Sequence, residues 1–143
     1  MSASSREYPL LGPVGTTGDF AVTTAGTYLG QWVSGLDGMR SMSAQLALSG
    51  ASGGTTIDAY LQTSLDGGAT AIDIANEHWT TSPAVKVLNF FTDVEVDAFA
   101  PTDGSMSSNT NQQGILGNMV RLKLVTVGTY TNTVVAGRIA TRS

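Results

Sequence analysis

Alternation of apolar and polar residues is the feature of this sequence that most constrains its fold. In residues 41–50, SMSAQLALSG, an apolar residue occupies every even position from 42 to 48. Residues 55–64 and 119–127 alternate in the same way, whereas no stretch carries a convincing helical period. Alternation with a period of two and one polar face is typical of antiparallel strands that lie on a core.

Strand-like segments of this kind recur along the chain, with turn residues between them. We expect strands at residues 19–24, 28–34, 41–50, 55–64, 70–75, 84–91, 119–127 and 132–141. Short strands at regular spacing without intervening helices favour a β-sandwich or a barrel. The expected fold is therefore all-β, an antiparallel and jelly-roll-like β-sandwich of about eight strands.

The first 18 residues differ from the rest because prolines and glycines interrupt any regular structure in them. We interpret residues 1–18 as an extended N-terminal arm and residues 19–143 as a single β-sandwich domain. A disordered tail is the alternative. The arm carries apolar residues that are candidate contacts with a capsid or a neighbouring subunit, namely Tyr8, Leu10, Leu11 and Val14.

The composition excludes several classes of function. Charged residues make up 13% of the chain, against roughly 25% in ordinary soluble domains, so small polar residues dominate the expected surface. Such a surface is easily desolvated and suits a protein that packs against copies or neighbours. The absence of cysteine excludes disulfides and thiolate chemistry. A net charge of −4 argues against a nucleic-acid partner, and no apolar run approaches the roughly 18 residues of a membrane span.

The single histidine, His78, is the first candidate for catalysis. A Ser-His-Asp arrangement is formally possible, but no serine lies in a G-x-S-x-G turn. A zinc site would need further His or Cys ligands. No glycine-rich phosphate loop opens a helix, so we expect no catalytic residue, metal or cofactor, and we favour a loop or interface role for His78.

The segment DVEVD places three carboxylates two residues apart, at Asp93, Glu95 and Asp97. On a strand they would share one face, with Val94 and Val96 on the other. A solvated or edge-protecting face is the first interpretation. A docking surface for a basic partner and a cation site are the alternatives, although calcium loops supply their ligands from a tight turn.

Residues 64–71, SLDGGATA, resemble the Asp-box, S-x-D-x-G-x-T-W, at Ser64, Asp66, Gly68 and Thr70, with Ala71 in place of the tryptophan. In the families that carry it, this motif is a structural β-hairpin corner and not a catalytic site. The resemblance implies that Asp66 accepts hydrogen bonds from backbone N–H groups of the turn, while Gly67 and Gly68 adopt positive φ.

The order of elements over about residues 42–140 is similar to that of small virion structural proteins of tailed bacteriophages, in particular capsid decoration (cement) proteins. The pieces that carry this resemblance are YLQTSLDGGAT, VKVLNF, a long Ser/Asn-rich loop, and GILGNMVRLKL. The resemblance implies a protein made in the host cytoplasm that binds the capsid exterior. Its partners would be the major capsid protein, whose subunits it bridges, and copies of itself in a dimer or trimer. The arm and the loop 100–114 are the expected contacts.

Three other functions remain open from the sequence. The chain is also compatible with another virion role, as a head–tail connector or a tail protein. A carbohydrate-binding β-sandwich module would use exposed aromatic side chains, with Trp79 as the residue to test. A hydrolase that uses the acidic residues 93–97 is the third alternative, although catalytic carboxylates of glycosidases face each other across a groove.

Overall fold

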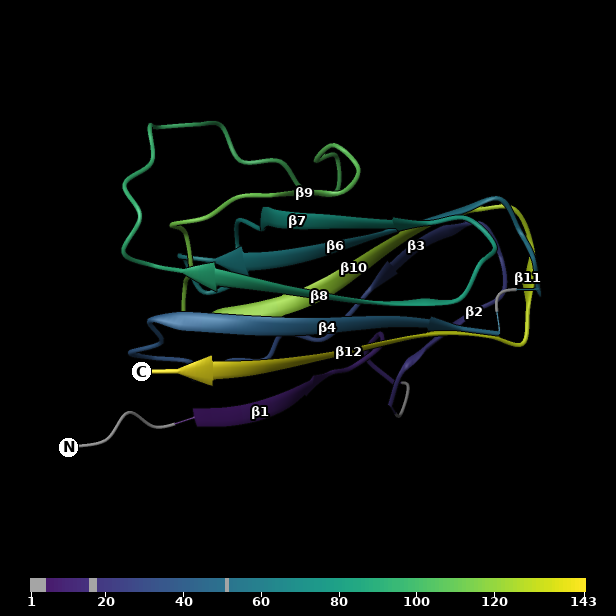
Figure 1. Ribbon diagram of the computed structural model, residues 1–143, viewed down its shortest axis with the longest axis horizontal. Helices are drawn as coiled ribbons and strands as arrows, with labels where there is room; N and C mark the ends of the chain where they lie inside the picture. The colour runs from purple at the N-terminus through teal and green to yellow at the C-terminus, as the bar shows by residue number, and fades with distance from the viewer. Residues whose placement is uncertain (1–4, 16–17, 51) are drawn as a thin grey trace.

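The computed structural model describes residues 5–15, 18–50 and 52–143. Within these residues every regular element is a β-strand, and every strand pair is antiparallel. Two sheets, here called A and B, contain five strands each (Figure 1). The expected all-β antiparallel sandwich is therefore confirmed.

Sheet A contains the first and the last strands of the chain. Its order is β1 (Ser5–Leu10), β12 (Thr133–Arg142), β4 (Ser41–Ser49) and β8 (Ala84–Phe91), and β2 (Phe20–Val22) also pairs with β12. The alternation noted in residues 41–50 corresponds to burial, because the even residues 42–48 of β4 are buried. Odd residues of β4 and β8 point to the opposite face, which the described chain leaves exposed.

Sheet B has the order β3 (Gly26–Leu29), β10 (Met119–Val127), β6 (Thr56–Ser64), β7 (Ile72–Trp79) and β9 (Thr110–Asn111). The short strands β5 (Ser52–Gly53) and β11 (Tyr130–Thr131) pair with each other at one end. A register shift beside Leu61 leaves Ile74 without a pairing partner in β6, which is typical of a β-bulge. As a result Asp73 lies opposite Gln62 on the outer face, while Ile74 and Ala75 are both buried.

One hydrophobic core fills the space between the sheets. Strands of both sheets contribute its largest fully buried side chains, among them Phe20, Leu46, Phe90, Leu122 and Ile139. Burial of apolar surface at about 25 cal/mol per Å² makes this core the main source of stability. It also holds the outer faces of the two sheets in fixed positions.

The expectation of an N-terminal arm separate from the domain is wrong for residues 5–10. Residues 5–10 are extended, but they form an edge strand that pairs with Gly137–Arg142 of β12. Tyr8 and Leu10 alternate with Glu7 and Pro9 and therefore point to the core of their own domain. Pro9 is tolerated because an edge strand has no further neighbour that needs its missing N–H. Residues 1–4 and 16–17 of the expected arm lie outside the described residues.

Candidate functional site

The turn between β6 and β7 has the structure that the partial Asp-box predicts. Ser64 Oγ donates to Asp66 Oδ1 at 2.9 Å and accepts the backbone N–H of Gly68 at 2.9 Å. Asp66 Oδ1 also accepts the N–H of Thr70 at 2.8 Å, and these hydrogen bonds from Thr70 and Ser64 lower the pKa of Asp66. Gly67 and Gly68 have φ of 74° and 96°. The hairpin-corner prediction is therefore confirmed.

The two glycines of this corner have different surroundings. A Cβ on Gly67 would meet open space, whereas a Cβ on Gly68 would lie 3.2 Å from Nε1 of Trp32. The guanidinium of Arg121 also lies over the ring of Trp32, with its central carbon 4.4 Å from the ring centroid. The corner is thus packed onto the segment that precedes β4, and Gly68 is needed for this close approach.

A buried carboxylate that the sequence analysis missed, Asp73 on β7, holds the loop that follows β8. Its oxygens accept the hydroxyl of Thr102 at 2.8 Å and the backbone N–H groups of Gly104, Ser105 and Met106 at 2.8–3.3 Å. Asp73 is 2% exposed. Backbone N–H groups that converge on a buried anion form strong hydrogen bonds. The loop 100–114 is therefore tied to the face of sheet B over residues 102–106.

A polar network extends from Asp73 across the outer face of sheet B. The amide of Gln62 donates to Asp73 at 2.9 Å and to Asp103 at 2.7 Å, and its oxygen accepts from Nε of Arg121 at 2.8 Å. Nζ of Lys123 lies 3.0 Å from Asp103. Burial alone would raise the pKa of Asp103, but hydrogen bonds from Gln62 and Lys123 and nearby positive charges lower it. Burial lowers the pKa of Arg121, and the charges of Asp103 and Asp73 oppose this shift.

His78 forms a pair with Asp58 on neighbouring strands of sheet B. Its Nδ1 lies 2.8 Å from Oδ1 of Asp58, and both side chains are partly exposed. Its backbone N–H and C=O contact the side chains of Asn109 and Lys86. No described hydroxyl group bonds to the imidazole, so the geometry gives His78 a structural partner and no nucleophile.

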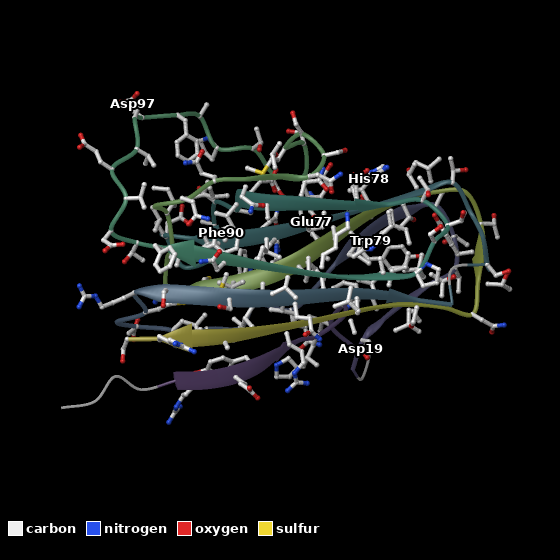
Figure 2. The ribbon with its side chains drawn as sticks, viewed as in Figure 1. Asp19, Glu77, His78, Trp79, Phe90 and Asp97 are labelled. Atoms are coloured by element: carbon white, nitrogen blue, oxygen red, sulfur yellow. The ribbon has the colours of Figure 1, made fainter. Side chains whose placement is uncertain are left out.

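The carboxylates of Asp93, Glu95 and Asp97 do not lie on a strand, so they form no shared strand face and protect no strand edge. The segment after β8 has no regular structure, because the chain leaves sheet A there to reach sheet B. All three side chains are exposed, and none forms an ion pair with a described residue. Figure 2 shows Asp97 at the outer edge of the chain that follows β8. No group of three metal-ligating side chains is found in the described part of the chain.

An apolar depression of about 380 Å³ lies beside this acidic segment. The β6–β7 corner contributes Leu65 and Ile72, and the chain beyond β8 contributes the remaining walls. Leu65 and Phe99 are 65% and 42% exposed. We call this depression with the carboxylates of residues 93–97 the acidic groove; its apolar lining is Leu65, Ile72, Val96, Ala98, Phe99, Pro101 and Ile115.

The outer face of sheet A is a second exposed surface, which combines apolar side chains of β8 with Arg138 and Arg142 of β12. We call it the basic face. Val85, Val87 and Phe91 of β8 are 62%, 72% and 48% exposed. In the strand register Val87 shares a row with Arg138 of β12, and Phe91 shares one with Arg142. A shallow depression of about 250 Å³ lies on this face, with Ser43, Gln45 and Ala140 among its lining residues and Glu7 as the carboxylate at its β1 edge.

The remaining predicted contact residues are distributed unevenly. Leu10 is 0% exposed and belongs to the core, so its predicted role as a partner contact is wrong in this conformation. Tyr8 also packs against the core, and Leu11 is half-buried. Val14 is 87% exposed and stays a candidate contact. Trp79 is 3% exposed, which removes it as a stacking platform for a sugar.

Comparisons with protein-family models, with curated proteins and with solved structures found no match. The part of the chain that the structure describes has no helix with the length and hydrophobicity of a membrane-spanning segment. The observations that bear on function are therefore the strand order and the surfaces described above.

Proposed function

We propose that this protein is a structural component of a tailed-bacteriophage virion, a capsid decoration (cement) protein without enzymatic activity. The observation that carries the proposal is the order of the eight main strands, β1-β12-β4-β8 in one sheet and β3-β10-β6-β7 in the other. We interpret this order as a jelly roll, an architecture that viral capsid proteins use.

The surfaces support a role in binding other proteins. The basic face and the acidic groove both combine exposed apolar side chains with charges that lack ion-pair partners among the described residues. Exposed apolar patches rimmed by polar residues are typical of interaction sites. In the proposed role, each copy lies on the capsid exterior and buries surface on two or more subunits of the major capsid protein. Many weak contacts then oppose opening of the shell together.

The loop 100–114 fits this role because Asp73 holds it against sheet B, so a partner would bind a surface that is already ordered. Asp73 and Gln62 hold residues 102–106 against sheet B before any partner arrives. Binding by such a surface avoids part of the entropy cost of ordering a free loop. The proposal includes no nucleic acid, membrane or cofactor.

Jelly rolls also occur in lectins, so the same strand order favours a carbohydrate-binding module as the second candidate. Its aromatic platform would have to come from Phe91 or Phe99, which are half-exposed. On a glycan array, binding by the unmodified protein together with loss of that binding in Phe99→Ala would support this candidate over the virion role.

The copy number per particle tests the proposed position in the virion. Quantitative mass spectrometry of purified particles should find this chain at a number comparable to that of the capsid subunits. A head–tail connector or tail-tip protein would instead be present at the few copies of a single ring. Absence from purified particles would contradict the proposed function altogether.

A further inference from the structure

Two surfaces of this protein are complementary to each other in charge and alike in apolar character. Among the described residues, nine large hydrophobic side chains are exposed, and six of them lie at the basic face or beside the acidic groove. Those at the basic face are Val85, Val87 and Phe91, and those at or next to the acidic groove are Leu65, Val94 and Phe99. Scattered single residues need no explanation, but such clustering marks contact surfaces.

Apart from Glu7 at the β1 edge of the basic face, the charges at these two surfaces are of opposite sign and form no ion pair with a described residue. Asp93, Glu95 and Asp97 form no ion pair with a described residue, and neither do Arg138 and Arg142. In contrast, Lys86, Arg121 and Lys123 each have a carboxylate partner within the chain. The carboxylates of residues 93–97 in one copy can therefore pair with Arg138 and Arg142 of another copy.

The two surfaces cannot meet within one molecule. The basic face is the side of sheet A that points away from the core, and the acidic groove lies by the β6–β7 corner of sheet B. A contact between them must join two copies of the chain. The two surfaces adjoin, because the N–H of Thr92 donates to Arg40 C=O and the N–H of Arg40 donates to Arg142 C=O. Two copies can therefore meet in a two-fold dimer, in which each groove lies on the other copy's face, or several copies can form a ring.

Addition of strands at the sheet edges is a less suitable way for copies to associate. At the β8 edge, the side chain of Gln113 accepts the N–H of Phe91 at 2.9 Å and donates to the C=O of Asn89 at 2.6 Å. At the β1 edge, Pro9 lacks an N–H group. Each edge of sheet A is therefore interrupted at these positions, which favours its outer face for association.

We propose that copies of this protein associate with each other, with the acidic groove of one copy on the basic face of another. The apolar side chains of β8 lie against the lining of the groove, while Arg138 and Arg142 pair with the carboxylates of residues 93–97. A two-fold dimer or a closed ring fills every groove and every face, whereas an open chain leaves one of each empty at its ends. The inference rests on the proposed function only in that many copies meet on one particle.

Charge reversal of each surface tests this contact with purified protein alone. One variant carries Asp93→Lys, Glu95→Lys and Asp97→Lys, and the other carries Arg138→Glu and Arg142→Glu. Sedimentation velocity should show oligomers of the unmodified protein, and high salt should weaken their association. In each variant the affinity between copies should fall by about tenfold or more. An equimolar mixture of the two variants should associate again, because each reversed surface then meets its opposite charge.

Controls separate this contact from a general effect of charge or misfolding. Asp19→Lys changes an exposed charge that belongs to neither surface and should leave association unchanged. Val87→Ser should weaken association, whereas Leu29→Ser, also at an exposed position, should not. Circular dichroism and thermal unfolding confirm that each variant folds.

Three results would overturn the inference. These are a monomeric unmodified protein at every soluble concentration, association that both reversed variants retain, and a mixture of variants that stays monomeric. Capsid binding is measured separately, so a monomer that still binds capsids would contradict this contact and leave the proposed function standing. Oligomers that never bind a capsid would contradict the proposed function and leave this contact standing.

Discussion

The two carboxylate oxygens of Asp73 lie 2.9 and 2.8 Å from the backbone nitrogen of Gly104. A strand residue of sheet B therefore holds a loop that is 31 residues away in the sequence. This single side chain turns a Ser/Asn-rich loop into part of the folded surface, with Gln62 bonded to the same carboxylate.

Replacement of Asp73 should release this loop. In Asp73→Ala, the N–H groups of Gly104, Ser105 and Met106 lose their acceptor, and the free energy of unfolding should fall by roughly 2–4 kcal/mol. Hydrogen exchange at these amides should become faster. The matched control Asp93→Ala removes an exposed carboxylate and should change stability by about 0.5 kcal/mol or less. Equal losses in both variants would contradict the assigned role of Asp73.

The two glycines of the β6–β7 corner should respond differently to the same substitution. Gly67→Ala adds a methyl group in open space, so its cost is the positive φ alone, about 1 kcal/mol. Gly68→Ala has the same backbone cost and also presses on Trp32, so it should destabilise the protein more. Chemical denaturation of both variants measures the difference, and a larger loss in Gly67→Ala would show that the packing against Trp32 is wrong.

The hydroxyl of Ser64 is central to the same corner. Ser64 is 0% exposed, and its Oγ both donates to Asp66 and accepts from Gly68. Ser64→Ala should lower the free energy of unfolding by about 1–2 kcal/mol because the part-buried N–H of Gly68 loses its acceptor and Asp66 loses a donor. Thermal unfolding checks this loss. Capsid binding should persist in the folded variant, and its selective loss without a change in stability would mean that the corner is a binding site.

Stability should decrease in acid through Asp66 and Asp103. Both carboxyl groups have a pKa below the ordinary value of 3.8 in the folded protein, the first through hydrogen bonds from Thr70 and Ser64. For the second, hydrogen bonds from Gln62 and Lys123 outweigh the effect of burial. A carboxyl whose pKa is lower in the folded state stabilises the fold above its unfolded pKa, and this contribution is lost as the pH falls through its folded pKa.

Denaturation near neutral pH and at about pH 3 measures this contribution. The double variant Asp66→Asn and Asp103→Asn should lose less stability between the two conditions than the unmodified protein. An identical loss in both proteins would assign the acid sensitivity to other carboxyl groups.

The sequence predicts the strands that alternate over a core and fails where tertiary contacts decide. The strands at residues 84–91 and 119–127 have the expected bounds, since their alternation reports one buried face. Residues 5–10 were expected to be an arm because Pro9 and the nearby glycines mask a period of two. Their pairing with β12 joins the two ends of the chain, which no local pattern reveals.

The same distinction applies to the candidate site. The hairpin corner is predictable because Ser64, Asp66 and Thr70 interact with one another over a few residues. Asp73 was missed because its partners lie in a distant loop, although a carboxylate between Ile72 and Ile74 beside a turn was a visible signal. The segment DVEVD alternates as a strand would, but it forms no strand in the structure, because strand formation depends on a neighbouring strand and not on alternation alone.

The thermal stability of capsids with and without this protein tests the proposed virion role most directly. Purified protein should bind expanded, empty capsids of its phage and raise the temperature at which they open, in proportion to the number of copies bound. The denatured protein, added at the same concentration, serves as the control. Binding to no capsid at any stage of maturation, or binding that leaves the opening temperature unchanged, would contradict the proposed function.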